Sequence, residues 1–182
     1  TVIIENRSGA GGNIGTVVVA KAPADGYMLL MASGSIFTVN PHLYSSLPFD
    51  PKKDFTPITK AGSFPMVIAV PSSSKLTSAK DLVDTVKHEP RGADIALPST
   101  SARLVMELLK ERSATPLFGV PYKGSGAAIT DMLGGQVDLM FDSITSARPH
   151  IQSGKLQALG VTSARRSSAL PDVPTMAEAG VP

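Results

Sequence analysis

Residues 116–161 alternate short apolar runs with amphipathic stretches, and this alternation restricts the fold more than any other part of the chain. Each apolar run is too short for a helix and is bounded by Gly, Pro or Ser, as buried strands are. The runs are residues 117–120, 137–141 and 156–161. Between them lie two helical patterns, residues 125–133 and 146–153, and each is followed by glycine. This order predicts parallel strands covered by helices on both faces of a sheet.

The same alternation continues toward the N-terminus. Short apolar runs predict four more strands, at residues 2–4, 27–32, 65–70 and 94–97. Further helices are predicted at residues 16–21, 78–88 and 102–112, and Ser78 has the side chain of an N-cap. Strands alternating with helices define an α/β protein.

Composition excludes several classes of protein. The chain has 182 residues, a net charge of +2 and scattered Lys and Arg, which speaks against a nucleic-acid partner. It has no Cys, so disulfides and thiolate metal sites are absent. No apolar run approaches the roughly 20 residues that a membrane span needs. Because the chain begins at Thr1 without a leader sequence, we expect a piece of a longer protein.

Residue patterns that carry enzymatic chemistry are missing, and we predict neither catalytic residues, a metal site nor a cofactor. The glycine-rich turn at residues 8–15 has Ile14 where the dinucleotide fingerprint needs its third glycine, and it has no P-loop lysine. The spacing of His42, His88 and His150 matches no metal cluster. Gly124-Ser125-Gly126 is too short for a nucleophile elbow.

Small polar groups follow three of the predicted strands at their carboxyl ends, where open α/β sheets bind ligands. We predict ligand contacts at Ser33, Gly34, Ser35, Ser99, Thr100, Ser101, Asp142 and Ser143. An ordinary Gly/Ser loop explains the first triplet equally well. A capping Ser with two incidental neighbours explains the second.

Ser99-Thr100-Ser101 should provide the stronger contact, because a helix begins there. Free backbone N–H groups, a positive macrodipole and donating hydroxyls suit a carboxylate. Asp142 would repel an anion that it faced. We therefore expect Asp142 to orient a hydrogen-bond donor, a water or a ligand amine.

Five stretches of the chain, in order and at family spacing, resemble the Bug family, the TctC-like extracytoplasmic receptors of tripartite tricarboxylate transporters. They read VIIENRSGAGGNIG, ADGYMLL, LPFDPKKDFTPIT, VPYKGSGAAITDMLGGQVDLMFDS and LGVTSARRSSALPDVPTMAEAGVP. The resemblance implies a type II periplasmic binding protein with two α/β lobes that close on a small carboxylate. It also implies a periplasmic location and delivery of the ligand to membrane transporter subunits.

Two departures from the family pattern carry further expectations. Family members have segments before Thr1 and after Pro182, so we expect residues 1–70 and 161–182 to form an incomplete first lobe and residues 71–160 a whole second lobe. An incomplete lobe exposes apolar edges, which predicts a dimer or a swapped assembly of this piece. The family's ligand loop places His where Arg103 stands, and this Arg would favour a more acidic ligand.

Two alternatives to a solute receptor stay open on the residues alone. The effector-sensing domain of a bacterial transcription regulator shares the two-lobed fold, and an upstream helix-turn-helix would indicate it. A small Rossmann-like enzyme is the other, and the broken glycine fingerprint opposes it.

Overall fold

The computed structural model describes residues 1–89 and 91–181. The chain divides into two compact units, Thr1–Ala61 and Gly62–Pro182, and each is described here by itself.

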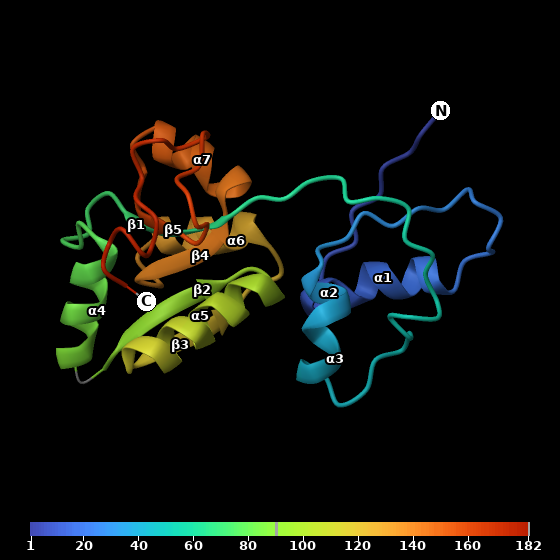
Figure 1. Cartoon of the computed structure of the whole chain (residues 1–182), viewed down its shortest axis with the longest axis horizontal. Helices are drawn as coiled ribbons and strands as arrows, with labels where there is room; N and C mark the ends of the chain where they lie inside the picture. The colour runs from blue at the N-terminus through green and yellow to red at the C-terminus, as the bar shows by residue number, and fades with distance from the viewer. Residues whose placement is uncertain (90, 182) are drawn as a thin grey trace. The chain divides into compact units, whose positions relative to one another are not determined.

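A five-stranded sheet forms the centre of the second unit (Figure 1). Its strands are β1 (Met66–Pro71), β2 (Ala93–Leu97), β3 (Leu117–Pro121), β4 (Leu139–Ser143) and β5 (Leu156–Val161), in the spatial order β3-β2-β4-β1-β5. Strand β2 is parallel to β3 and β4, whereas β1 is antiparallel to β4 and β5. Four strands therefore share one direction. The predicted α/β class is confirmed, with one strand opposed to the rest.

Helices cover both faces of this sheet, as the alternation predicted. Their bounds are α4 (Ala79–His88), α5 (Thr100–Ser113), α6 (Ser125–Leu133) and α7 (Ile144–Gln152). Helices α4 and α5 pack on the face that carries Ile68, Ile95 and Phe141. Helices α6 and α7 cover the opposite face, which carries Met140 and Val67. The Ser78 hydroxyl caps α4 by accepting the N–H of Asp81 at 3.0 Å.

The segment after β5 wraps around the edge of the sheet. Leu170 packs with α7 on one face, and Val181 joins the core beneath α4 and α5 on the other. Between them Thr175 forms a parallel bridge with Val161. In this chain β1 and the segment after β5 thus belong to the second unit. The predicted division into two lobes, residues 1–70 with 161–182 and residues 71–160, stays a prediction.

The first unit has short helices and no strand among its described residues. The helices are the 3-10 turn Ala10–Gly12, α1 (Asn13–Ala20), α2 (Ser35–Thr38) and α3 (Asn40–Leu43). They are tied together by the buried Asn40 amide, which donates to Asn13 Oδ1 at 2.6 Å and to the Gly11 carbonyl at 3.3 Å. Phe37 and Phe49 each pack edge-to-face on Phe55.

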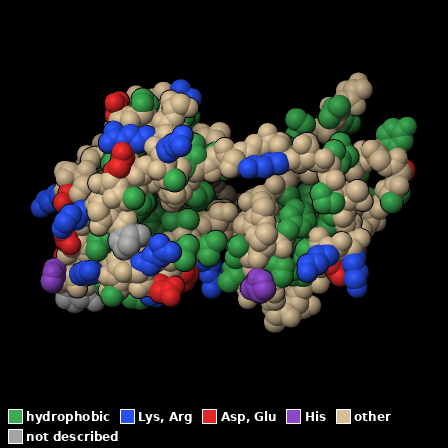
Figure 2. All heavy atoms as spheres, in the orientation of Figure 1, with side chains coloured by type: hydrophobic (Ala, Val, Ile, Leu, Met, Phe, Trp, Pro, Cys, Tyr) green, Lys and Arg blue, Asp and Glu red, His purple; other side chains and the backbone are tan. Residues whose placement is uncertain are grey.

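The strands predicted at residues 2–4 and 27–32 are wrong for this chain, because neither segment forms a strand. Val2 is 90% exposed, Tyr27 94% and Met31 87%. Figure 2 shows such hydrophobic side chains on the surface of the first unit. A strand needs a neighbour for its backbone N–H and C=O groups, and these segments have none within the described chain. No described helix combines the length and apolar character of a membrane span.

Candidate functional site

The candidate site lies at the carboxyl ends of β2 and β4, which are neighbours in the sheet and are followed by helices on opposite faces. Ala96 pairs with Met140, so continuing this register puts Ser99, just beyond the end of β2, level with Ser143, the last residue of β4. Strand β2 continues into α5 on one face, and β4 continues into α7 on the other. Such a switch point leaves a crevice at the carboxyl ends of parallel strands. The structure thus brings the predicted Ser99-Thr100-Ser101 and Asp142-Ser143 to one edge.

The first turn of α5 supplies donors to this edge. Ser99 is the N-cap, and its Oγ accepts the N–H of Ala102 at 3.2 Å. The N–H groups of Thr100 and Ser101 have no acceptor within the described part of the chain. These groups carry the positive end of a 14-residue helix. The turn is therefore suited to hold an anion.

Helix α7 begins at the same edge with a second serine cap. The Ser143 Oγ accepts the N–H of Ser146 at 3.2 Å and lies 2.9 Å from the Ser146 Oγ. The N–H of Ile144 donates to the Pro65 carbonyl, just before β1, at 3.2 Å. The Ser143 hydroxyl thus lies at the crevice, and the hydrogen bonds of Ser146 and Ile144 hold the first turn of α7 in place.

Asp142 is a buried carboxyl group at the end of β4, with 4% of its surface exposed. Its Oδ1 accepts the N–H of Ser143 at 2.6 Å, whereas its Oδ2 has no partner in the described structure. Burial raises the pKa of Asp142, and the Ser125 hydroxyl and the Ser143 N–H oppose that rise. The Ser125 hydroxyl lies near the Asp142 carboxyl group but outside hydrogen-bond geometry, so Asp142 Oδ2 has no partner among the described residues.

Ser125 is a site residue that the sequence analysis did not select. It opens α6, whose N-cap Gly124 provides no side-chain hydrogen bond, and its hydroxyl lies close enough to Asp142 to influence that carboxyl group. The sequence shows Gly124-Ser125-Gly126 as a motif that is too short for a nucleophile elbow. Its position before a helix and after an apolar run was the signal for a ligand-edge residue.

Ser33, Gly34 and Ser35 lie in the first unit, at the start of α2. The hydroxyls of Ser33 and Ser35 are 3.0 Å apart, with Ser33 in the loop before this four-residue helix and Ser35 as its first residue. A role for this triplet in ligand binding stays a prediction.

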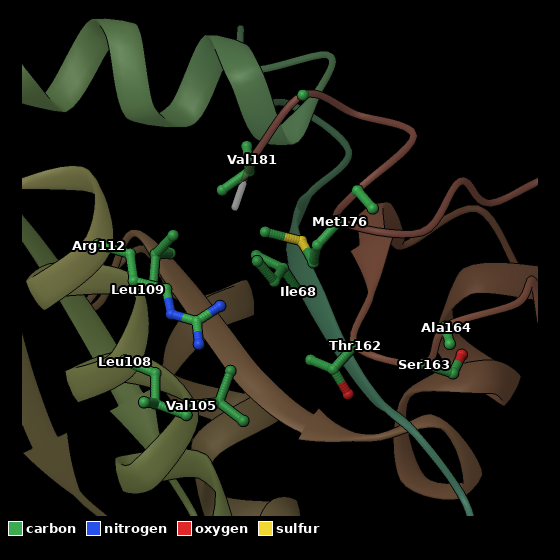
Figure 3. Close-up of a pocket in the computed structure, with 12 residues that line it drawn as sticks. Ile68, Val105, Leu108, Leu109, Arg112, Thr162, Ser163, Ala164, Met176 and Val181 are labelled. Carbon is green, nitrogen blue, oxygen red and sulfur yellow. The ribbon is translucent and has the colours of Figure 1, made fainter.

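A hollow of about 660 Å³ lies elsewhere in the second unit, between α5 and the segment after β5. Its lining is mostly apolar, with Arg112, Thr162 and Ser163 as polar members, and Arg112 extends into it from α5 (Figure 3). It lies over the middle of the α4/α5 face, away from the switch point, so it is not the candidate site. Among the described residues, no three His, Asp or Glu side chains gather as metal ligands would.

Known proteins share both the sequence and this arrangement. The family model described as "Tripartite tricarboxylate transporter family receptor", TctC, matches residues 1–182. The chain belongs to the TctC family. This confirms the resemblance to periplasmic solute-binding receptors, which are not enzymes.

Individual TctC relatives agree over the whole chain. Protein BugT of Bordetella pertussis is 40% identical over 184 residues, which cover 100% of this chain and 56% of BugT. The R. palustris protein Rpa4515, solved with adipate, is 36% identical with a TM-score of 0.94, covering 99% of this chain and 61% of that one. MatC of Rhodopseudomonas palustris, solved with bound malate, is 28% identical with a TM-score of 0.83, covering 96% and 60%. The chain thus spans about half the length of curated relatives such as BugT.

Proposed function

We propose that the protein to which this chain belongs captures a small carboxylate and delivers it to the membrane subunits of a tripartite transporter. The observation that carries the proposal is the crevice between β2 and β4, where a helix start with free N–H groups meets several hydroxyls. Relatives solved with adipate and malate support a carboxylate as the ligand class. Membership of the TctC family supports a transporter partner and a periplasmic location.

The chemistry of the edge suits capture and release. Free N–H groups and hydroxyls hold a carboxylate without a full opposing charge, and hydrogen bonds to a charged group contribute about 1.5–3 kcal/mol each. A few such bonds give binding that is strong enough for capture and still reversible.

Calorimetric titration of the full-length receptor with dicarboxylates tests the proposal. We expect Thr100→Val and Ser99→Ala each to weaken carboxylate binding about tenfold or more, since about 1.4 kcal/mol corresponds to a factor of ten. Ser78→Ala is the matched control, because Ser78 caps α4 as Ser99 caps α5 but lies far along the chain from the crevice. Unchanged affinity in Thr100→Val and Ser99→Ala, with the fold intact, would place the ligand elsewhere. The same titration with Ser33→Ala and Ser35→Ala tests the predicted contacts in the first unit.

A further inference from the structure

The apolar hollow between α5 and the segment after β5 has no part in the proposed function. The residues beneath it, Ile68, Leu109 and Val181, belong to the core of the second unit. Its walls are more open, since Leu108 on α5 is 41% exposed and Met176 on the opposite wall is half-buried. A concave apolar surface of this kind is typical of binding sites.

One charged side chain enters this apolar surface. Arg112 lies one turn after Leu108 on α5, and its guanidinium extends over the hollow toward Ile68 (Figure 3). Within the described part of the chain Arg112 takes part in no ion pair, and no Asp or Glu lines the hollow. A guanidinium without a carboxylate partner, set among apolar side chains, is complementary to an anion. Its planar donors suit a carboxylate in particular.

The size of the hollow favours a small molecule over a protein partner. Its volume of about 660 Å³ lies within the range of about 300–1,000 Å³ that is usual for small-molecule pockets. A stable protein–protein interface involves about 20–30 residues on each side. Only 12 residues line the hollow among those that the structure describes.

We propose that the hollow binds an amphiphilic acid, of which a medium-chain alkyl carboxylate is the simplest example. The carboxylate pairs with the Arg112 guanidinium, and the hydrocarbon body covers Val105, Leu108 and Met176, which removes apolar surface from water. The flexible thioether of Met176 adjusts to bodies of different shape. This site is distinct from the crevice, because Arg112 follows Thr100 by about 18 Å along α5 at 1.5 Å per residue.

Titration of the full-length receptor with alkyl acids tests the proposal. Calorimetry with hexanoate, octanoate and decanoate, below their critical micelle concentrations, should show affinity rising about twofold to fourfold per added CH₂ group. The alcohol 1-octanol has the same hydrocarbon body without the charge and should bind at least tenfold more weakly than octanoate. Arg112→Gln should remove that difference. Leu108→Ser should weaken the binding of decanoate more than that of hexanoate.

Two controls separate this site from the crevice. Arg148→Gln removes a cation from α7, on the opposite face of the sheet, and should leave octanoate binding unchanged. Thr100→Val should weaken dicarboxylate binding and leave octanoate binding intact. If octanoate does not bind, or binds Arg112→Gln as tightly as wild type, the proposal is overturned, and another part of the receptor or a partner protein covers the hollow. Loss of octanoate binding in Thr100→Val would place the acid in the crevice and overturn the proposal as well.

Discussion

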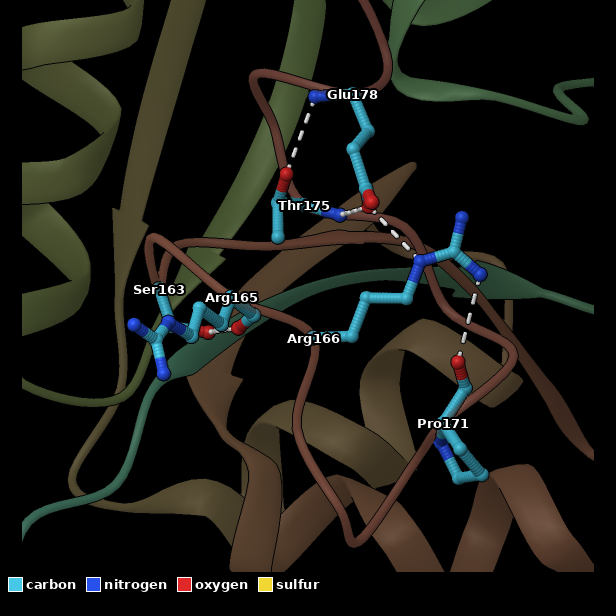
Figure 4. Close-up of polar contacts among 6 residues, drawn as sticks. All are labelled: Ser163, Arg165, Arg166, Pro171, Thr175 and Glu178. Atoms are coloured by element: carbon cyan, nitrogen blue, oxygen red, sulfur yellow. Dashed lines mark hydrogen bonds and ion pairs between the residues drawn. The ribbon is translucent and has the colours of Figure 1, made fainter.

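Thr175 and Glu178 hold each other through two reciprocal hydrogen bonds. The Thr175 N–H donates to Glu178 Oε2 at 2.8 Å, and the Glu178 N–H donates to Thr175 Oγ1 at 3.1 Å (Figure 4). Arg166 Nε donates to the same Glu178 oxygen at 2.9 Å. The pKa of Glu178 is lowered, first by the Thr175 N–H and then by Arg166. This capping box fixes the turn that leads to the buried Val181.

Replacing Thr175 by Ala should lower the free energy of unfolding by about 1 kcal/mol, the usual cost of a lost N-cap. The Thr175 side chain is buried beside β5, so no water replaces the missing hydroxyl. Denaturant titration measures the change. Thr175→Ser keeps the hydroxyl and should lose much less, and equal losses in the two variants would contradict the capping role.

Asp142→Asn should raise the free energy of unfolding at pH 7 by about 1 kcal/mol. The reason is that the substitution removes a buried carboxylate that has too few hydrogen-bond partners. The sign follows from the pKa of Asp142, which burial in the folded protein raises above its ordinary value of 3.8. Between the unfolded and folded values the native protein binds more protons, so stability falls as pH rises through that range and stays lower above it.

Denaturant titrations at several pH values check this expectation. The difference between Asp142→Asn and wild type should disappear below pH 3.8, where Asp142 is neutral in both states. Asp172→Asn changes the same charge on an exposed side chain and serves as the control. If Asp142→Asn is no more stable than wild type at pH 7, burial of the Asp142 carboxylate does not destabilise the folded protein.

Gly92→Ala should destabilise the second unit more than Gly135→Ala does. Both glycines have left-handed backbone, with φ of +71° and +73°, so each substitution carries a similar conformational cost of about 1 kcal/mol. A Cβ at Gly92 would lie 2.3 Å from the Pro116 carbonyl oxygen, whereas a Cβ at Gly135 meets nothing within 4 Å. We expect an extra loss of about 1–3 kcal/mol at Gly92 from this overlap. Similar unfolding midpoints for the two variants would refute it.

The 182-residue chain should self-associate through its exposed apolar segments at residues 2–4 and 27–31. Unpaired β-branched and apolar segments of this kind recruit partner strands. Light scattering should show dimers or larger species, and Ile3→Lys with Met31→Lys should shift them toward monomer. Leu43→Lys on α3 is the control for added charge. A wild-type monomer at high concentration with a cooperative melt would contradict the prediction.

The contrast between the two units shows what the sequence can reveal. In the second unit each apolar run finds its neighbours within the chain, so the runs at 117–120 and 156–161 became strands close to the predicted bounds. The runs at 2–4 and 27–32 have the same composition but no neighbour, and they are exposed coil. The composition of a segment indicates that it is suited to a sheet. The segment forms a strand only where a neighbouring strand can pair with its backbone.

The site was partly predictable for a related reason. Hydroxyls at the start of a helix are visible as a motif, so Ser99-Thr100-Ser101 and Ser143 could be chosen from the sequence. The order of strands in the sheet depends on contacts between distant parts of the chain, so the sequence pattern does not reveal that β2 and β4 are neighbours. Ser125 was missed because its effect on Asp142 depends on α6 crossing back from β3 to β4. The direction of β1 was likewise hidden, since periodicity does not encode orientation.

The reversed direction of β1 determines where the chain enters the second unit. Met66 pairs with Ser143, and the Ile144 N–H donates to the Pro65 carbonyl at 3.2 Å. The polypeptide that joins the two units is therefore anchored to the first turn of α7, at the rim proposed to hold the ligand. A parallel β1 would have brought it in at the far rim. The antiparallel direction of β1 thus places the proposed ligand rim and the first residues of the joining segment side by side within the second unit.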